Sequence, residues 1–142
     1  MNPLRHLLPA LYTVLTAPPL VADGGDVPAY EHLAEPEAGH YVLLTQPTAV
    51  GASGARDCRQ WSCTALVDIV TQFAPGYVSS APADELADAV TDRVEGQSLA
   101  LPAGYQCGPA RLELHSELRE LDGELVAVRR LLRFRWEVFY TV

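Results

Sequence analysis

The feature that most constrains this chain is a pair of alternating segments on either side of Asp122-Gly123. Residues 110–120 alternate between apolar and polar side chains, and residues 125–141 do so over a longer stretch. Alternation with a period of two is typical of β-strands, and Asp-Gly is a frequent hairpin turn. The pattern predicts a β-hairpin whose second strand far exceeds the usual length of roughly 5–6 residues.

The register of this hairpin depends on the length of its turn. A two-residue turn would place Glu113 opposite Leu132, on the apolar face, which is unfavourable. We therefore predict a three-residue loop, Asp122 to Glu124, with a bulge at Gly123. This loop makes five pairs: Leu112 with Phe134, Leu114 with Leu132, Leu118 with Val128, Glu113 with Arg133 and Glu117 with Arg129.

A strand as long as 125–141 is rarely left exposed in a monomer. Either it bends across the domain or its far end pairs with a neighbouring chain, and we favour a sister copy. Trp136, Phe139 and Tyr140 near its end would anchor such a contact well.

The segments before the hairpin predict helices and further strands. Residues 3–16 and 82–95 carry apolar side chains at helical spacing, although Pro9 interrupts the first. Residues 40–46 and 58–73 are rich in residues that suit β-sheets. Segments rich in Pro, Gly or small residues predict loops at 18–39, 47–54 and 97–109, the first with short extended pieces.

This order predicts a single α+β domain over residues 1–142. We expect an antiparallel β-sheet with two main helices packed on one face and a long C-terminal β-hairpin. Apolar residues make up 49% of the 142 residues, which is enough for a core without disulfide bonds.

Charge and cysteine content limit the classes of partner and compartment. The net charge is −8, so the chain as a whole is repelled by nucleic-acid phosphates. Cys58, Cys63 and Cys107 are odd in number and lack CxxC spacing, which favours reduced thiols over a disulfide framework. One Cys63–Cys107 bridge stays open as an alternative. Neither a secretory signal nor an apolar membrane span is present, so we expect a soluble protein.

No catalytic, cofactor or metal site emerges from the residue patterns, and we expect no enzyme. His32, Glu35, Glu37 and His40 lie close together but match no zinc-ligand spacing. Cys63 falls on the apolar face of its predicted strand, which favours a buried structural thiol over a nucleophile. The segment 51–54 lacks the lysine and spacing of a phosphate-binding loop.

A row of arginines on the last strand is the main candidate binding feature. Arg129, Arg133 and Arg135 share one face, and Arg130 lies on the other. Three interpretations are open: a solvated, ion-paired face, a subunit interface, or a contact with nucleic acid. The candidate interface comprises Arg129, Arg133, Arg135, Glu113, Glu117, Trp136, Phe139 and Tyr140.

The order of the segments is itself a recognisable pattern. A leading helix with LLPALYTVL precedes a Pro-rich loop with Val27-Pro28-Ala29-Tyr30 and a strand HYVLLTQPT. A unit from WSCTALVDIVTQF to ELADAVTDRV follows, and then a closing β region. Over most of the chain this layout resembles the phage tail terminator (tail completion) proteins, although it carries no invariant chemical motif.

The resemblance implies a structural role in a virion. Such proteins form rings, commonly hexamers, on the end of the tail tube, where they stop polymerisation of the tube protein and offer a docking surface to head–tail connector proteins. DNA passes through the ring without specific binding. The resemblance implies a homo-oligomer in the tail or neck of the virion, assembled in the host cytoplasm, with no cofactor and no membrane.

Two other functions remain open from the sequence. A head–tail connector or neck protein has a similar size and also forms rings. A monomeric module that binds a small ligand or a host protein belongs to a different class. The long Pro- and Gly-rich loop and the arginine-bearing hairpin depart from the tail-terminator layout, so ring size and interface stay undecided.

Overall fold

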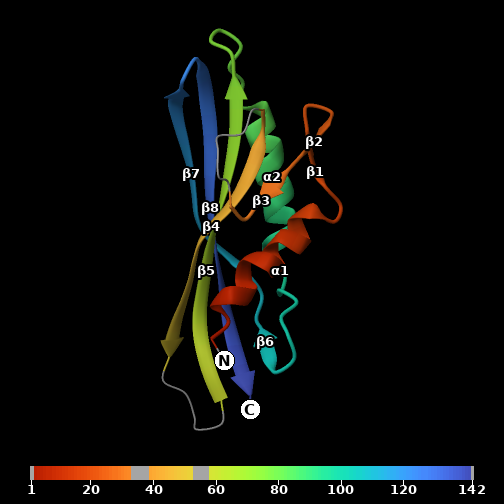
Figure 1. Ribbon diagram of the computed structural model, residues 1–142, viewed down its shortest axis with the longest axis vertical. Coiled ribbons are helices and arrows are strands. Elements are labelled where there is room, and N and C mark those ends of the chain that lie inside the picture. The colour runs from red at the N-terminus through yellow and green to blue at the C-terminus, as the bar shows by residue number, and fades with distance from the viewer. Residues whose placement is uncertain (1, 33–38, 53–57, 142) are drawn as a thin grey trace.

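The computed structural model describes residues 2–32, 39–52 and 58–141, with only the backbone at Ala52, Cys58 and Asp122. Two helices and eight strands are described, and Figure 1 shows the long strands running along the longest axis. In chain order these are α1 (Leu4–Thr16), β1 (Leu20–Ala22), β2 (Gly25–Val27), β3 (Ala29–Tyr30), β4 (Tyr41–Ala52), β5 (Cys58–Phe73), α2 (Ala81–Val94), β6 (Tyr105–Cys107), β7 (Arg111–Asp122) and β8 (Leu125–Thr141).

The main sheet has six strands, and most of its pairs are antiparallel. Its order is β3-β4-β5-β8, and the far edge of β8 is shared between β7 and β6. The short β3 runs parallel to β4, whereas the other described pairs of this sheet are antiparallel. β1 and β2 form a separate small hairpin. The predicted α+β class with a long C-terminal hairpin is confirmed.

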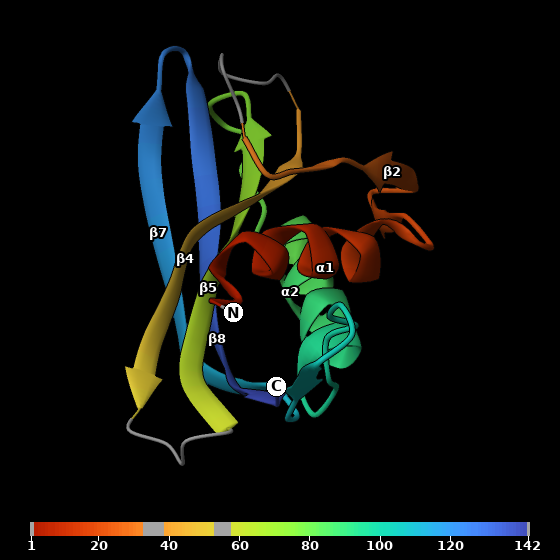
Figure 2. The same ribbon diagram turned by 60° about the horizontal axis from the view of Figure 1, so that its bottom comes forward.

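Both helices lie on the same side of the sheet, as Figure 2 shows. Leu7, Leu11 and Leu15 form the buried stripe of α1. The helix continues through Pro9, which lies on its exposed side and costs it one backbone hydrogen bond. Beneath the helices, alternate residues of β5 and β8 supply the rest of the core. The fully buried members with the largest side chains include Trp136, Phe134, Ile69, Leu132 and Val67.

β8 occupies the middle of the sheet, contrary to our expectation that its far end pairs with a second copy. It pairs with β5 continuously from Val126 to Thr141. Its other edge pairs with β7 from Leu125 to Arg135 and with β6 from Val138 to Tyr140. A strand bonded to its own sheet along both edges has little backbone left to offer another chain. The unusual length of β8 is therefore explained within one molecule.

The hairpin turn also differs from the prediction. Asp122 pairs with Leu125, so the loop has the two residues Gly123 and Glu124, and the irregularity lies at Glu113. This bulge keeps Leu112 opposite Phe134 but shifts the rest of β7 by one residue. The predicted partners of four other residues are wrong: Leu114 faces Arg133, Leu118 faces Arg129, Glu117 faces Arg130, and Glu113 itself is unpaired in the bulge.

The predicted loop at 18–39 holds the short strands β1, β2 and β3, in line with its expected extended pieces, and the other two predicted loops contain strands as well. β4 continues through Pro47 to Ala52, because a bulge between Thr45 and Thr48 accommodates a residue that cannot donate a backbone hydrogen bond. The segment 97–109 contains β6. Positions 53 and 54 of the predicted 47–54 loop lie outside the described residues.

Candidate functional site

The sheet face opposite the helices, here called the open face, is the candidate site. β4, β5, β7 and β8 present alternate side chains there, and no described element packs over it (Figure 2). Its outer part leaves Val50, Leu114 and Leu118 exposed. The open face also holds most of the polar groups contributed by β5 and β8.

An ion-pair network spans the open face near one end. The side chain of Asp68 is only 5% exposed and pairs with Arg129, whose Nε donates to Asp68 Oδ1 at 3.2 Å. Arg129 Nη1 also donates to Glu120 Oε1 at 2.6 Å, across the strand pair from β8 to β7. The hydrogen bond to Asp68 is the main reason that the pKa of Arg129 is raised. The guanidinium offsets the cost of burying the Asp68 carboxylate.

A second polar group of residues surrounds a shallow pocket at the β4 bulge. The pocket has a volume of about 300 Å³. Thr48 and Thr64 hydrogen-bond to each other through their hydroxyl groups, and Ser62 and Gln46 lie beside them. Gln46 has a left-handed backbone with φ of 49°, which belongs to the irregular part of β4. The guanidinium groups of Arg133 and Arg135 complete the lining.

Arg135 is already held by its own chain. It donates to Glu113, which the β7 bulge brings toward it, and to the hydroxyl of Ser62. Ser62 in turn donates to Glu137 Oε1 at 3.2 Å. The hydrogen bond with Glu113 raises the pKa of Arg135. Two carboxylates therefore offset the charge of Arg135, on the side of the pocket nearer the end of β8.

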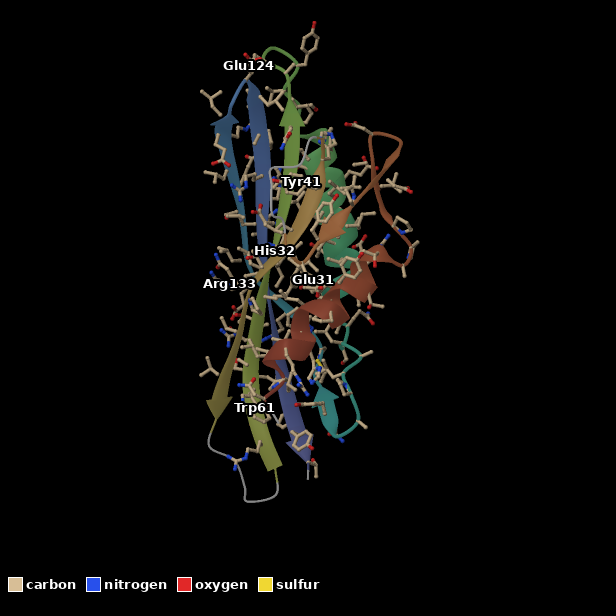
Figure 3. The ribbon with its side chains drawn as sticks, viewed as in Figure 1. Glu31, His32, Tyr41, Trp61, Glu124 and Arg133 are labelled. Carbon is tan, nitrogen blue, oxygen red and sulfur yellow. The ribbon has the colours of Figure 1, made fainter. Side chains whose placement is uncertain are left out.

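Arg133 differs from the other two arginines of this row. It is exposed and forms no ion pair with any carboxylate whose side chain the structure describes. Figure 3 shows it beside the sheet, on the side away from α1. Its cross-strand neighbours are Leu66 on β5 and Leu114 on β7, which are both apolar. Arg133 thus adds an uncompensated positive charge to a hydroxyl-lined pocket.

The eight predicted interface residues are not all available at the surface. Arg129, Arg133, Arg135 and Phe139 lie on the open face, and Glu113 reaches it through its bulge. Trp136 is fully buried under the helices and has no surface to offer a partner. Tyr140 lies on the helix face and packs against Tyr105, with ring centroids 4.8 Å apart. Glu117 lies on the edge strand β7 opposite Arg130, and so also on the helix face.

Sequence reasoning missed the partners of these arginines. Arg130 interrupts the apolar face of β8, and the structure pairs it with Asp84 in the first turn of α2. Glu117 lies 3.6 Å from Arg130 Nε, and His115 contacts the same guanidinium group. The sequence did carry a signal for this ion pair, namely a lone arginine on an otherwise apolar strand face. A charge in such a place needs a partner.

The two cysteines whose side chains the structure describes are both free thiols. Cys63 is buried, and Cys107 on β6 is partly buried. Burial raises the pKa of the Cys63 thiol to about 12 and raises that of Cys107 as well. Within the described parts of the chain, no three His, Cys, Asp or Glu side chains gather to hold a metal ion. Glu35 and Glu37 lie outside those parts.

No described helix is both long and apolar enough to cross a membrane. No protein-family model matches the chain, and no curated protein matches it in sequence. Among solved structures, the chain is similar to one from the "virion of native gene transfer agent (GTA) particle". The two chains share 25% sequence identity with a TM-score of 0.68. The similarity covers 92% of this chain and 94% of the virion chain.

Proposed function

We propose that this chain is a structural protein of a phage-like virion that caps the tail tube as a ring of identical copies. In this role it stops polymerisation of the tube and provides the docking surface for the head connector. It performs no catalysis, and DNA passes through the ring without specific binding.

The similarity to a chain of the gene transfer agent virion carries this proposal. It extends over nearly the full length of both chains, so it relates whole folds rather than one shared motif. The resemblance of the segment order to tail terminators supports the more specific role at the end of the tube. A ring of this kind does not require the long strand β8 to pair with another copy.

Two physical features are consistent with that role. The net charge of −8 disfavours adhesion to a passing DNA strand. The open face combines exposed apolar side chains with arginines, and arginine is enriched at protein–protein contacts. A ring subunit needs such a surface, whereas an isolated domain gains nothing from leaving it uncovered.

Tail length in particles assembled without this chain tests the proposal. The gene is deleted in a strain that produces the particles, and tails are measured by negative-stain electron microscopy. Tubes of uncontrolled, excessive length that return to normal on complementation are the expected result. Tails of normal length that lack heads would instead favour a neck or connector protein. Complete, normal particles would contradict any structural role in the virion.

A further inference from the structure

We infer that the open face, centred on Arg133 and its pocket, receives the acidic outer side of α2 from a second copy of this chain. This inference rests on the homo-oligomeric part of the proposed function and specifies which two surfaces meet. It replaces the contact through the end of β8, which the sheet topology leaves without free edges.

Arg133 carries a positive charge that no described carboxylate matches. Arg129 and Arg135 each pair with carboxylates of their own chain, but Arg133 pairs with none that the structure describes. Beside it, the hydroxyl groups of Thr48 and Thr64 line the pocket. Arginine together with a hydroxyl donor suits a carboxylate, because both can donate hydrogen bonds to its oxygens. The hydrogen bond between Thr48 and Thr64 uses one hydroxyl proton and leaves the other for such a partner.

The outer side of α2 carries the complementary negative charge. Glu85, Asp88 and Asp92 are all exposed, and none forms an ion pair with a described side chain. Their spacing of three and four residues places them on one side of the helix, away from the residues buried against the sheet. The helix's own arginine, Arg93, is occupied by the backbone carbonyls of Leu15, Pro18 and Pro19.

The spacings of the two surfaces agree. Arg133 and Arg135 are two residues apart on one strand, so their backbones are separated by about 7 Å. Carboxylates three or four residues apart on a helix are separated by about 5–6 Å at Cβ. One carboxylate of α2 can therefore meet the guanidinium group of Arg133 while its neighbour lies near Arg135, which keeps its own pair with Glu113. Exposed Leu114 and Leu118 can pack beside this contact.

The edges of the sheet are poor alternatives for the contact. Beyond the short β3, the outer edge of β4 carries Pro47 and a bulge, which both interrupt pairing with another strand. The outer edge of β7 carries Glu113, Glu117, Arg119 and Glu120, and charged residues protect an edge in the same way. The faces of the molecule are therefore favoured over its edges.

The geometry of this contact leads to a closed assembly or a filament. The open face and the outer side of α2 lie on opposite sides of the molecule (Figure 2). Contact between two different surfaces is heterologous, so it repeats from copy to copy and generates a ring where the rotation closes. A dimer held by one such contact would leave the open face of one copy and the acidic side of α2 of the other unused.

Sedimentation velocity of the purified full chain at low and high salt tests the inference. The wild-type chain is expected to associate at low salt and to dissociate as salt screens the charges. Arg133→Glu should weaken association at least about tenfold, because it juxtaposes like charges. Glu85→Arg with Asp88→Arg should weaken it equally, and combining all three substitutions should restore association.

Arg5→Glu is the matched control. Arg5 is an exposed arginine of α1, and its reversal gives the same change in net charge as Arg133→Glu. It should leave association unchanged apart from this general effect. Circular dichroism checks that each variant is folded, and the neutral Arg133→Gln serves if the reversed charge disturbs the sheet.

Three results would overturn the inference. They are undiminished association of folded Arg133→Glu, failure of the triple variant to recover, or a wild-type chain that is monomeric at all concentrations. None of them decides the proposed function, which the tail-length experiment tests separately. A chain that limits tail length but is insensitive to Arg133→Glu would keep its function and lose this interface.

Discussion

The two faces of the main sheet are built on different physical principles. On the helix face, alternate residues of β5 and β8 are mostly buried and almost all apolar. On the open face, the same strands present Ser62, Thr64, Asp68, Arg129 and Arg133. Burial of apolar area drives folding, whereas exposed ion pairs contribute little to it. Most of the stability should therefore reside on the helix face, which leaves the open face free to serve another purpose.

Two phenylalanines of β8 provide the most direct test of this difference. Phe134 is fully buried on the helix face, and Phe139 is partly exposed on the open face. Phe134→Ala should lower the free energy of unfolding by about 3–5 kcal/mol. Phe139→Ala should cost less than about half as much, because less apolar area is lost from burial. Urea denaturation of both variants measures this, and equal losses would contradict the contrast between the faces.

The Asp68–Arg129 pair is the part of the open face that we expect to matter for folding. Asp68→Asn should destabilise the chain by about 2 kcal/mol, because it leaves a partly buried guanidinium short of its partner. Asp84→Asn, which weakens the more exposed pair with Arg130, should cost about 0.5–1 kcal/mol. Thermal denaturation with a double-mutant cycle on Asp68 and Arg129 provides the measurement. A loss no greater than that of Asp84→Asn would mean that the Asp68–Arg129 pair stabilises the fold no more than the pair of Arg130 with Asp84.

The buried Cys63 thiol on the helix face should make the stability of the chain depend on pH. Burial raises its pKa to about 12 from the ordinary value of 9.0, so the folded chain keeps it protonated where the unfolded chain ionises. Its contribution to the free energy of unfolding is complete below pH 9. As the pH rises toward 12, this contribution falls by about 1 kcal/mol for each pH unit.

Iodoacetamide labelling at pH 8 tests the burial of this thiol. Cys63 should be modified only as fast as the native chain unfolds. Trypsin cleaves at Arg59, so mass spectrometry reports Cys63 and Cys58 on different peptides. Labelling of Cys63 that is as fast in native as in denatured protein would contradict its burial.

The smallest effect on stability should come from Arg133. It is exposed and lacks a described ion pair, so Arg133→Ala should change the free energy of unfolding of dilute, monomeric protein by less than about 0.5 kcal/mol. Differential scanning calorimetry at low concentration is the measurement. A loss above about 1 kcal/mol would mean that Arg133 stabilises the folded monomer, which weakens the case for an interface role.

Long regular patterns made much of this fold predictable. The helix predicted at 82–95 forms at Ala81–Val94, because its apolar stripe and early proline act locally. The apolar faces of β5 and β8 follow from alternation alone. The strand through Pro47 was missed, since its pairing with β5 is a tertiary contact that overrides the local signal.

The candidate site was only partly visible in the sequence. Alternation places Arg129, Arg133 and Arg135 on one face, as the structure does. Their partners could not be predicted, because Asp68 belongs to a strand whose neighbours are set by sheet order. The bulge that brings Glu113 to Arg135 is equally invisible, since one extra residue leaves the alternation on each side intact. Whether these residues meet another subunit stays a prediction.

The central position of β8 also has a consequence for the order in which the molecule folds. β4–β5 and β7–β8 are antiparallel pairs of consecutive strands, so each can form from neighbouring parts of the chain. The pairing of β5 with β8 joins segments far apart in sequence, because α2, β6 and β7 lie between them. Such a non-local closure is slow compared with hairpin formation. Pulsed amide exchange during refolding should show protection of the β7 amides that bond to β8 before the β5 amides that bond to β8. Simultaneous protection of the two sets would contradict this order of events.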